Sequence, residues 1–300
     1  MNFYIFNDRA SQNEVYRKVL IQYLSRCGFN VVSIGLFDSF VSFLKFILIA
    51  SFRGRNSLTS NIKVNLLFLV FVRSRGAIIL NGMGRYKNNR VVRKSICILL
   101  KINKRKRIIV QNYLDYRYIR LHFRRDVFWI PGSGALSRPI GKKNEYVVIS
   151  RRNKIHLQLE SFREAVESLP KLMVNIVGLD QSDFPERNYH DQVKCRGRVA
   201  QNDIFAHGNA YIQLHGYGEG LPHALTEAIF NDLRVYISKQ DFRNYGLGKL
   251  DYSWQHLEKN WGVCEPKSLG GKHNLEASKI AIDICHLLGF QLYNDVQKQP

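Results

Sequence analysis

Short apolar runs alternate with longer amphipathic segments along most of the chain. Runs rich in Val, Ile and aromatic side chains predict buried strands, and a 3.6-residue apolar period predicts helices. In the first part of the chain the expected strands are 2–7, 30–34, 77–80, 108–111 and 126–130. The expected helical or strongly apolar segments are 11–27, 39–52, 61–73, 90–107 and a stretch that begins at 112. Gly28 is well placed to end the first helix.

The second part of the chain has a cleaner alternation. Its expected strands are 146–150, 174–178, 194–199, 210–214 and 234–238. Its expected helices are 156–168, 201–207, the segment after Pro222, and one or two helices within 275–297. Repeated strand–helix units of this kind predict doubly wound parallel sheets, which bind ligands at the carboxyl ends of their strands. Pro131-Gly132-Ser133-Gly134 interrupts the pattern, so 131–145 is the expected connection between two domains.

Composition bounds the class of protein. An apolar content of 45% in 300 residues is enough for two domains with separate cores. The five cysteines are scattered and lack C-x-x-C spacing, which predicts neither a disulfide framework nor a zinc site and favours a reduced, cytosolic protein. We expect no secretory signal, because Asp8 and Arg9 follow the first apolar run directly. Neither long apolar segment reaches the roughly 20 residues that span a bilayer.

Charge is divided unevenly along the chain. Residues 1–130 hold 24 Lys+Arg against 5 Asp+Glu, whereas residues 131–300 hold 21 against 19. The first part therefore carries almost all of the net charge of +21, which indicates an anionic partner such as nucleic acid or an acidic membrane face. The basic, amphipathic segment 90–107 fits either partner. Segment 39–52 fits a membrane-facing helix and a core helix equally well, whereas 61–73 favours the core.

The stretch 216–230 carries the clearest chemical signal. It follows the expected strand 210–214, begins with three glycines in five residues, and continues as a helix for which Pro222 suits the first position. The backbone N–H groups around Gly218, Gly220 and Leu221 would then face an anion, most naturally a phosphate. Glu227 lies about one and a half turns into that helix, where its carboxylate can accept hydrogen bonds from ribose hydroxyls.

This stretch, with Glu219 and Glu227 eight residues apart, resembles the Glu-x7-Glu segment of retaining glycosyltransferases of the family-four type. The resemblance covers roughly residues 130–240 and includes the Pro-Gly-Ser-Gly junction and the strand end at Gly178. It implies the GT-B fold: α/β, with two Rossmann-like, doubly wound domains that face each other across a cleft. The implied domains are a basic, membrane-facing acceptor domain (1–131), a donor domain (132–275), and a last helix (276–300) that packs back toward the first domain.

The resemblance also implies site residues. Arg151 and Lys154 would hold the donor's pyrophosphate, although their spacing is about two residues shorter than is usual in the family. Glu219 would position or stabilise the donor sugar as the catalytic residue. The turn that contains Gly82, Gly84 and Arg85 is similar to the acceptor loop of family members that act on lipid-linked oligosaccharides, and it equally fits an ordinary turn. The general base stays open among three histidines, His122, His215 and His223.

The function implied is transfer of a sugar from a nucleotide-diphosphate donor to a glycan acceptor, with retention of anomeric configuration. The acceptor would be lipid-linked, as in O-antigen or capsule assembly, and the enzyme would lie at the inner face of the cell membrane. No metal or other cofactor is expected, since the chain has no Asp-x-Asp pair. Two alternatives stay open: a basic nucleic-acid-binding protein with a nucleotide-binding domain, and a transferase that binds donor without turnover. Nucleic acid is not the expected partner, because the aromatic residues of the first part form no evident stacking group in the sequence.

Overall fold

A computed structural model describes residues 1–52, 56–83, 89–124, 126–189, 191–215, 220–268 and 270–290. The chain forms two compact units. Unit 1 comprises residues 1–134, 217–221 and 277–300, and unit 2 comprises residues 135–216 and 222–276.

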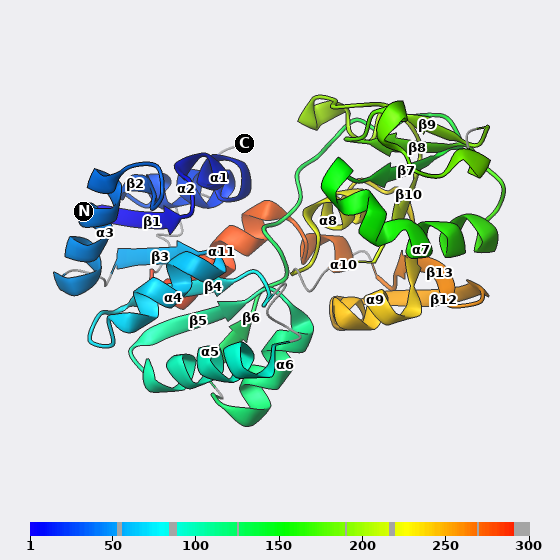
Figure 1. The fold of residues 1–300 in the computed structure, drawn as a ribbon. Coiled ribbons are helices and arrows are strands. Elements are labelled where there is room, and N and C mark those ends of the chain that lie inside the picture. Colours follow the sequence, from blue (N-terminus) through cyan, green and yellow to red (C-terminus); the bar gives the residue numbers. More distant parts are fainter. Residues whose placement is uncertain are drawn as a thin grey trace. The chain divides into compact units, whose positions relative to one another are not determined.

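Unit 1 is built on a six-stranded parallel sheet in the order β2-β1-β3-β4-β5-β6 (Figure 1). Its strands are β1 (Asn2–Asn7), β2 (Asn30–Gly35), β3 (Ser57–Ser60), β4 (Gly76–Leu80), β5 (Lys106–Val110) and β6 (Val127–Trp129). Its helices are α1 (Ala10–Tyr16), α2 (Lys18–Arg26), α3 (Phe40–Phe52), α4 (Ile62–Val70), α5 (Arg90–Ile102), α6 (Tyr113–His122) and α11 (Ala277–Leu288). The sheet winds outward in both directions from β1 and β3, which is the doubly wound arrangement that the alternation of elements predicted.

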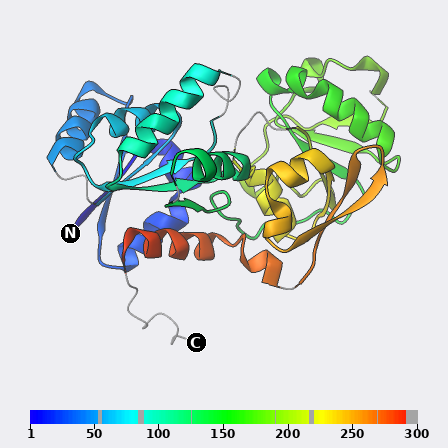
Figure 2. The same cartoon turned by 90° about the horizontal axis from the view of Figure 1, so that it is seen from below.

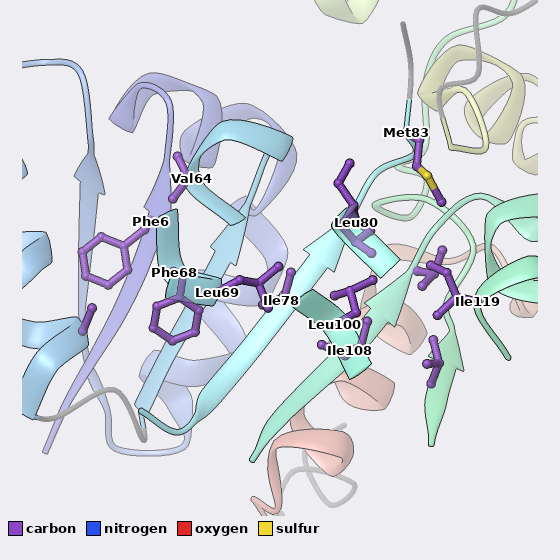
Figure 3. Packing of buried hydrophobic residues seen from close by; sticks show 14 of the residues in the cluster. Phe6, Val64, Phe68, Leu69, Ile78, Leu80, Met83, Leu100, Ile108 and Ile119 are labelled. Carbon is purple, nitrogen blue, oxygen red and sulfur yellow. The ribbon is translucent and has the colours of Figure 1, made fainter. Parts of the chain in front are cut away.

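Helices cover both faces of this sheet. Side chains of α3, α4, α5 and α6 form one core with the strands, and Figure 3 shows part of it around Phe6, Phe68 and Ile108. Side chains of α2 and α11 form the core on the opposite face. In Figure 2, α11 (red) accordingly lies across the sheet from α5 (teal). Both faces of each central strand are therefore buried, as parallel strands require.

Two features of unit 1 differ from the sequence-based expectation. Strand β3 was not predicted, because its sequence has a single apolar residue. It is a fully buried strand whose Thr59 hydroxyl donates to Asn65 Oδ1 at 2.7 Å. The helix expected at 11–27 is two helices, α1 and α2, which meet at Arg17.

Unit 2 has a seven-stranded sheet in the order β12-β13-β11-β10-β7-β8-β9. Its strands are β7 (Tyr146–Ile149), β8 (Val174–Val177), β9 (Val193–Cys195), β10 (Ala210–Gln213), β11 (Arg234–Ser238), β12 (Tyr252–Glu258) and β13 (Trp261–Pro266). Its helices are α7 (Arg152–Ser168), α8 (His223–Phe230), α9 (Lys239–Asn244) and α10 (Gly270–His273). The strands from β7 to β11 are parallel, and the sheet reverses its winding direction between β7 and β10.

Two features of unit 2 also differ from expectation. An antiparallel hairpin, β12 and β13, extends the sheet where no strands were predicted. Its turn passes through Lys259 with a φ of 51° instead of an Asn-Gly pair, so the sequence lacks the usual hairpin signal. The helix expected at 201–207 is a single 3-10 turn at Gln201–Asp203.

Across the described residues, no helix combines the length and the apolar character needed to cross a membrane.

Phe68 tests the core of unit 1. It is 0% exposed and packs near Phe46, with ring centroids 6.4 Å apart. We expect Phe68→Ala to lower the free energy of unfolding by about 3–5 kcal/mol, because the change leaves a cavity in a close-packed core. The matched control is Phe40→Ala, since Phe40 is 74% exposed on α3 and its loss should change stability by less than about 0.5 kcal/mol. Urea denaturation measures both, and equal effects would contradict this description of the core.

Candidate functional site

The point where the sheet of unit 2 reverses direction is the natural ligand site in an open α/β sheet. Strands β7 and β10 are neighbours there, and the chain leaves them toward opposite sides of the sheet. Ser150 follows β7, and His215 lies two residues after β10. The candidate site of unit 2 is therefore centred on the carboxyl ends of these two strands.

A chain of hydrogen bonds joins the two strand ends through α7. The Ser150 hydroxyl donates to Gln158 Oε1 at 2.9 Å, and Gln158 Nε2 donates to the carbonyl of His215 at 3.2 Å. The backbone N–H of His215 donates to Ser161 Oγ at 3.1 Å. Both backbone groups of His215 are thus held by side chains of α7.

His215 forms a close pair with Asp241. Its Nδ1 lies 2.6 Å from Asp241 Oδ2, and 40% of the His215 side chain is exposed. The hydrogen bond that His215 donates to Asp241 raises the pKa of His215 above its usual 6.5, against the effect of burial, and the charges of Glu164 and Glu160 on α7 also raise it. A raised pKa favours the imidazolium form, so His215 is suited to be a cation or a proton donor at this edge.

Glu227 is a buried carboxylate with basic partners. It is 1% exposed on α8, and its Oε1 accepts from Arg138 Nε at 2.9 Å and lies 3.3 Å from His223 Nε2. Burial works against ionisation of Glu227, but His223 and Arg138 together lower its pKa below the usual value. Sequence reasoning missed Arg138, because it lies in the stretch that was interpreted as an interdomain connection.

The basic residues at the start of α7 differ in exposure and in their contacts. Arg151 is the exposed N-cap of the helix, and Lys154 is half-buried in its first turn. Arg152 Nε lies 3.2 Å from Asp183 Oδ1, with 81% of the Arg152 side chain exposed. The assignment of the donor pyrophosphate to Arg151 and Lys154 stays a prediction. In the same region, Gly178 has a φ of 92°, and an added Cβ would lie 2.5 Å from the carbonyl oxygen of Ser150, so glycine is required there.

The glycine-rich stretch is described only from Gly220 onward, and Gly218 and Glu219 lie outside the described residues. Gly220 and Leu221 belong to unit 1, where a Cβ on Gly220 would lie 2.5 Å from the carbonyl oxygen of Asn81. The sequence predicts Pro222 as the first residue of the helix, but Pro222 is the N-cap of α8. Its ψ of 134° is extended, and its carbonyl accepts from the N–H of Thr226 at 3.0 Å, the first bond of the helix.

The predicted acceptor turn is described in part. Gly82 has a φ of 135°, while Gly84 and Arg85 lie outside the described residues. The next residue, Met83, donates its N–H to Asp115 Oδ2 at 2.8 Å, so Met83 is held by the first turn of α6. Among the histidines considered as general base, His122 lies on α6 with its ring 5.0 Å from that of Tyr118.

Three aromatic rings of unit 1 form a group that the sequence did not reveal. Tyr113, Tyr116 and Trp129 have centroids between 4.8 and 6.4 Å apart and are all half-buried. These rings do not test the prediction that the aromatic residues of the first part are not grouped into a stacking platform. They come together because α6 begins where β5 ends and packs beside β6. Their rings contact each other closely and do not leave separate positions for successive bases.

Within the described part of the chain, no group of three or more His, Cys, Asp or Glu side chains is arranged to hold a metal ion.

Comparison with known proteins places the fold. The sequence matches no protein-family model and no curated protein. The structure is similar to a crystal structure of HepE from Anabaena in complex with UDP, with a TM-score of 0.56 and 11% identity over 95% of this chain and 90% of that chain. A DNA-modifying β-glucosyltransferase gives a TM-score of 0.46 and 13% identity over 81% of this chain and 82% of that chain. Two sheets dominated by parallel strands, together with the similarity to the HepE structure, confirm the expected GT-B fold class.

Asp241→Asn tests the pair at the strand ends of unit 2. We expect the pKa of His215, measured by NMR titration, to fall below 6.5, because burial then acts without the carboxylate that offsets it. The pKa of His215 is raised by folding, so the pair stabilises the protein fully at low pH and its contribution disappears as pH rises through the folded pKa. Asp241→Asn should therefore lower stability at pH 6 by about 1 kcal/mol and have less effect at pH 9. The control is Asp191→Asn, an exposed carboxylate of unit 2, and an unchanged His215 titration in Asp241→Asn would refute the pairing.

Proposed function

We propose that this protein is a retaining glycosyltransferase that moves a sugar from a nucleotide-diphosphate donor to a lipid-linked glycan in the assembly of a bacterial surface polysaccharide. The observation that carries the proposal is the GT-B fold, which is similar over 95% of this chain to a HepE structure that holds UDP. The sequence supports it independently through the Glu-x7-Glu stretch and the basic residues Arg151 and Lys154.

The reaction needs stabilisation of a leaving diphosphate. Negative charge grows on that group as the bond to the sugar breaks, and preorganised cations lower the energy of this state. Arg151 and Lys154 are the donor-binding cations in this proposal, and His215, whose pKa is raised beside Asp241, is proposed as a further positive group at the same edge of unit 2. Glu219 keeps the role of positioning the sugar. The chemistry proposed for these residues requires no metal ion.

Glu227 is proposed to bind the ribose. Its ionised carboxylate is a hydrogen-bond acceptor only, which suits hydroxyl groups better than phosphate. The contacts with Arg138 and His223 both end on Oε1, so Oε2 is the oxygen proposed to accept from the ribose. Arg138 would then hold the carboxylate ionised and in place.

Nucleotide titration with a substitution at Glu227 tests this function. We expect UDP or GDP to bind with micromolar affinity in calorimetry. Glu227→Gln, which keeps the shape of the side chain and removes its charge, should weaken that binding about tenfold or more. The 2′- and 3′-deoxy forms of the same nucleotide complete a double-mutant cycle. If Glu227 accepts from the ribose, the penalty for removing one of the hydroxyls shrinks in Glu227→Gln.

Three outcomes distinguish the possibilities. An unchanged deoxy penalty with weaker nucleotide binding would assign Glu227 a structural role through Arg138. Absence of UDP and GDP binding, together with tight, salt-sensitive binding of DNA or RNA, would contradict the transferase proposal and favour the nucleic-acid function. Nucleotide binding without sugar transfer to any lipid-linked acceptor would favour the transferase without turnover.

A membrane partner is proposed from the surface of unit 1. Helix α3 exposes Phe40, Val41, Leu44 and Leu48, with exposed fractions of 74%, 59%, 48% and 65%. These positions share one side of the helix, because they recur at the helical period, and the exposed Lys45 lies among them. The opposite side, including Phe46 and Ala50, is buried in the core of unit 1. The helix therefore belongs both to the core and to an exposed apolar surface, so the two interpretations of 39–52 are compatible.

Helix α5 presents a similar mixed surface on the same face of the sheet. Its exposed side carries Val91, Ile98 and Ile102 together with Arg90, Lys94 and Lys101. Apolar groups enter the acyl boundary, while basic groups meet anionic headgroups at about 1 kcal/mol each. An anionic bilayer surface is the occupant that matches both properties, and it would also present a lipid-linked acceptor.

Vesicle co-sedimentation tests the membrane surface. We expect the protein to bind vesicles that contain anionic phospholipid and to bind neutral vesicles weakly. Replacing Phe40, Leu44 and Leu48 with Ser should lower the partition coefficient more than tenfold, because each side chain loses part of about 1.5–3 kcal/mol of apolar transfer energy. Leu157→Ser is the control, since Leu157 is 67% exposed on α7 of unit 2. Equal binding by the triple variant and the control would exclude α3 as the membrane surface.

A further inference from the structure

Arg17 is a buried charge in unit 1 that the proposed chemistry does not use. It lies between α1 and α2 and is 3% exposed. Buried arginines are rare unless a carboxylate or another charged group compensates them.

The partners of Arg17 are all neutral. Nη1 donates to Ser133 Oγ at 3.1 Å and to the carbonyl of Tyr16 at 3.5 Å, and Nη2 donates to Asn81 Oδ1 at 3.3 Å. Within the described parts of the chain, Nε has no hydrogen-bond partner and no carboxylate pairs with the guanidinium. Burial without a charge partner lowers the pKa of Arg17 to about 10.

Two other arginines, whose side chains are largely buried, are compensated by carboxylates. Arg124 makes two bonds of 2.5 Å to Asp126 and donates to four backbone carbonyls of unit 1. Arg138 in unit 2 pairs with Glu227 at 2.9 Å. Arg17 makes three bonds of 3.1–3.5 Å, half as many as Arg124, and has no such counter-charge among the described residues. No described carboxylate therefore offsets the cost of burying Arg17.

The guanidinium lies at the edge of the sheet where ligands bind. Asn81 follows the last residue of β4, so the head group of Arg17 is at the carboxyl end of a parallel strand. Gln111, which follows β5, donates to the carbonyl of Gly132 beside Ser133. Gly220 lies close to both residues. A Cβ added to Gly220 would lie 2.5 Å from the Asn81 carbonyl oxygen and 3.0 Å from Gln111 Cβ. This strand edge therefore holds a hydroxyl, two carboxamides and a guanidinium that has no carboxylate partner among the described residues.

We propose that Arg17 is an anion-binding residue of unit 1 that takes a phosphate or diphosphate group of a substrate. A bidentate guanidinium matches phosphate oxygens, and the missing counter-charge is the one the ligand would supply. Ser133 and Asn81 now serve Arg17 as acceptors through side chains that can rotate. When a phosphate replaces them, the Ser133 hydroxyl and the Asn81 amide can turn their own donors toward it.

The identity of the substrate rests on the proposed function, which offers two sources of this group. One is the diphosphate of the nucleotide-sugar donor, and the other is the diphosphate of a lipid-linked acceptor. Inorganic diphosphate carries the shared chemistry and depends on neither source.

Calorimetry on the full chain tests the proposal with Arg17→Met, Arg17→Lys and a control, Arg26→Met, which removes the same charge from an exposed position on α2. We expect Arg17→Met to weaken inorganic diphosphate binding at least tenfold, Arg17→Lys to retain part of it, and Arg26→Met to bind as the parent does. Arg17→Met should also unfold at the same or a higher denaturant concentration, because it removes an uncompensated buried charge.

Further ligands distinguish the two sources. If Arg17 binds the donor diphosphate, the parent binds UDP more tightly than uridine and Arg17→Met loses this difference. Unchanged UDP binding with weaker binding of a short-chain polyprenyl diphosphate identifies the acceptor. If the parent binds inorganic diphosphate through Arg17 but binds no nucleotide, the proposed function fails and the anion site stands.

Two results overturn the proposal. One is unchanged binding of all these phosphate ligands in both Arg17 variants, or absence of such binding in the parent protein. The other is a loss of stability in Arg17→Met and Arg17→Lys with diphosphate affinity retained, which would make Arg17 a structural link to Asn81 and Ser133.

Discussion

Burial of parallel strands on both faces is the constraint on which this protein depends. A parallel strand cannot leave one face in water, so each strand–helix unit must cover one side of a sheet, and the units must wind in two directions to cover both. In unit 1 the winding separates at β1 and β3, and in unit 2 at β7 and β10. Each separation leaves the carboxyl ends of two adjacent strands without a connection above them. In unit 2, Ser150 and His215 follow the two strands at this separation, whereas in unit 1 Asn81 and Gln111 follow β4 and β5, farther along the sheet.

Polar groups at these edges are held by secondary structure and not by loops alone. Helix α7 fixes both backbone groups of His215, and α6 holds the Met83 N–H through Asp115. Hydrogen bonds from neighbouring helices hold the backbone in place, so a side chain can be positioned while part of it stays exposed. The pair of His215 and Asp241 illustrates this, since a 2.6 Å contact coexists with substantial exposure.

Charge has different roles in the two units. Unit 2 is nearly balanced, and its buried Arg138 and Glu227 compensate each other. Unit 1 holds nearly all of the positive excess, much of it on the exposed sides of helices whose other sides form the core. An amphipathic helix can carry surface charge and contribute to the core, because residues at a 3.6-residue period fall on two separate sides of the helix. The net charge of unit 1 is thus a surface property that leaves its core unchanged.

The sequence by itself determined the α/β class, most strands and helices, and the strand and helix on either side of the glycine-rich stretch, because hydrophobic period and glycine or proline punctuation are local signals. It did not reveal β3, whose polar residues are buried by neighbouring strands, or the hairpin of β12 and β13, whose turn lacks a glycine. For the candidate site, the sequence indicated Arg151, Lys154 and Glu227 from their positions beside predicted strand ends and a glycine turn.

Only the tertiary structure decided which partners these residues have. Glu227 pairs with Arg138 and His215 pairs with Asp241, although the partners are far apart in the chain. Likewise, only the folded chain shows that no described carboxylate pairs with the Arg17 guanidinium. Burial and charge compensation are properties of the packed chain, and no local pattern encodes them.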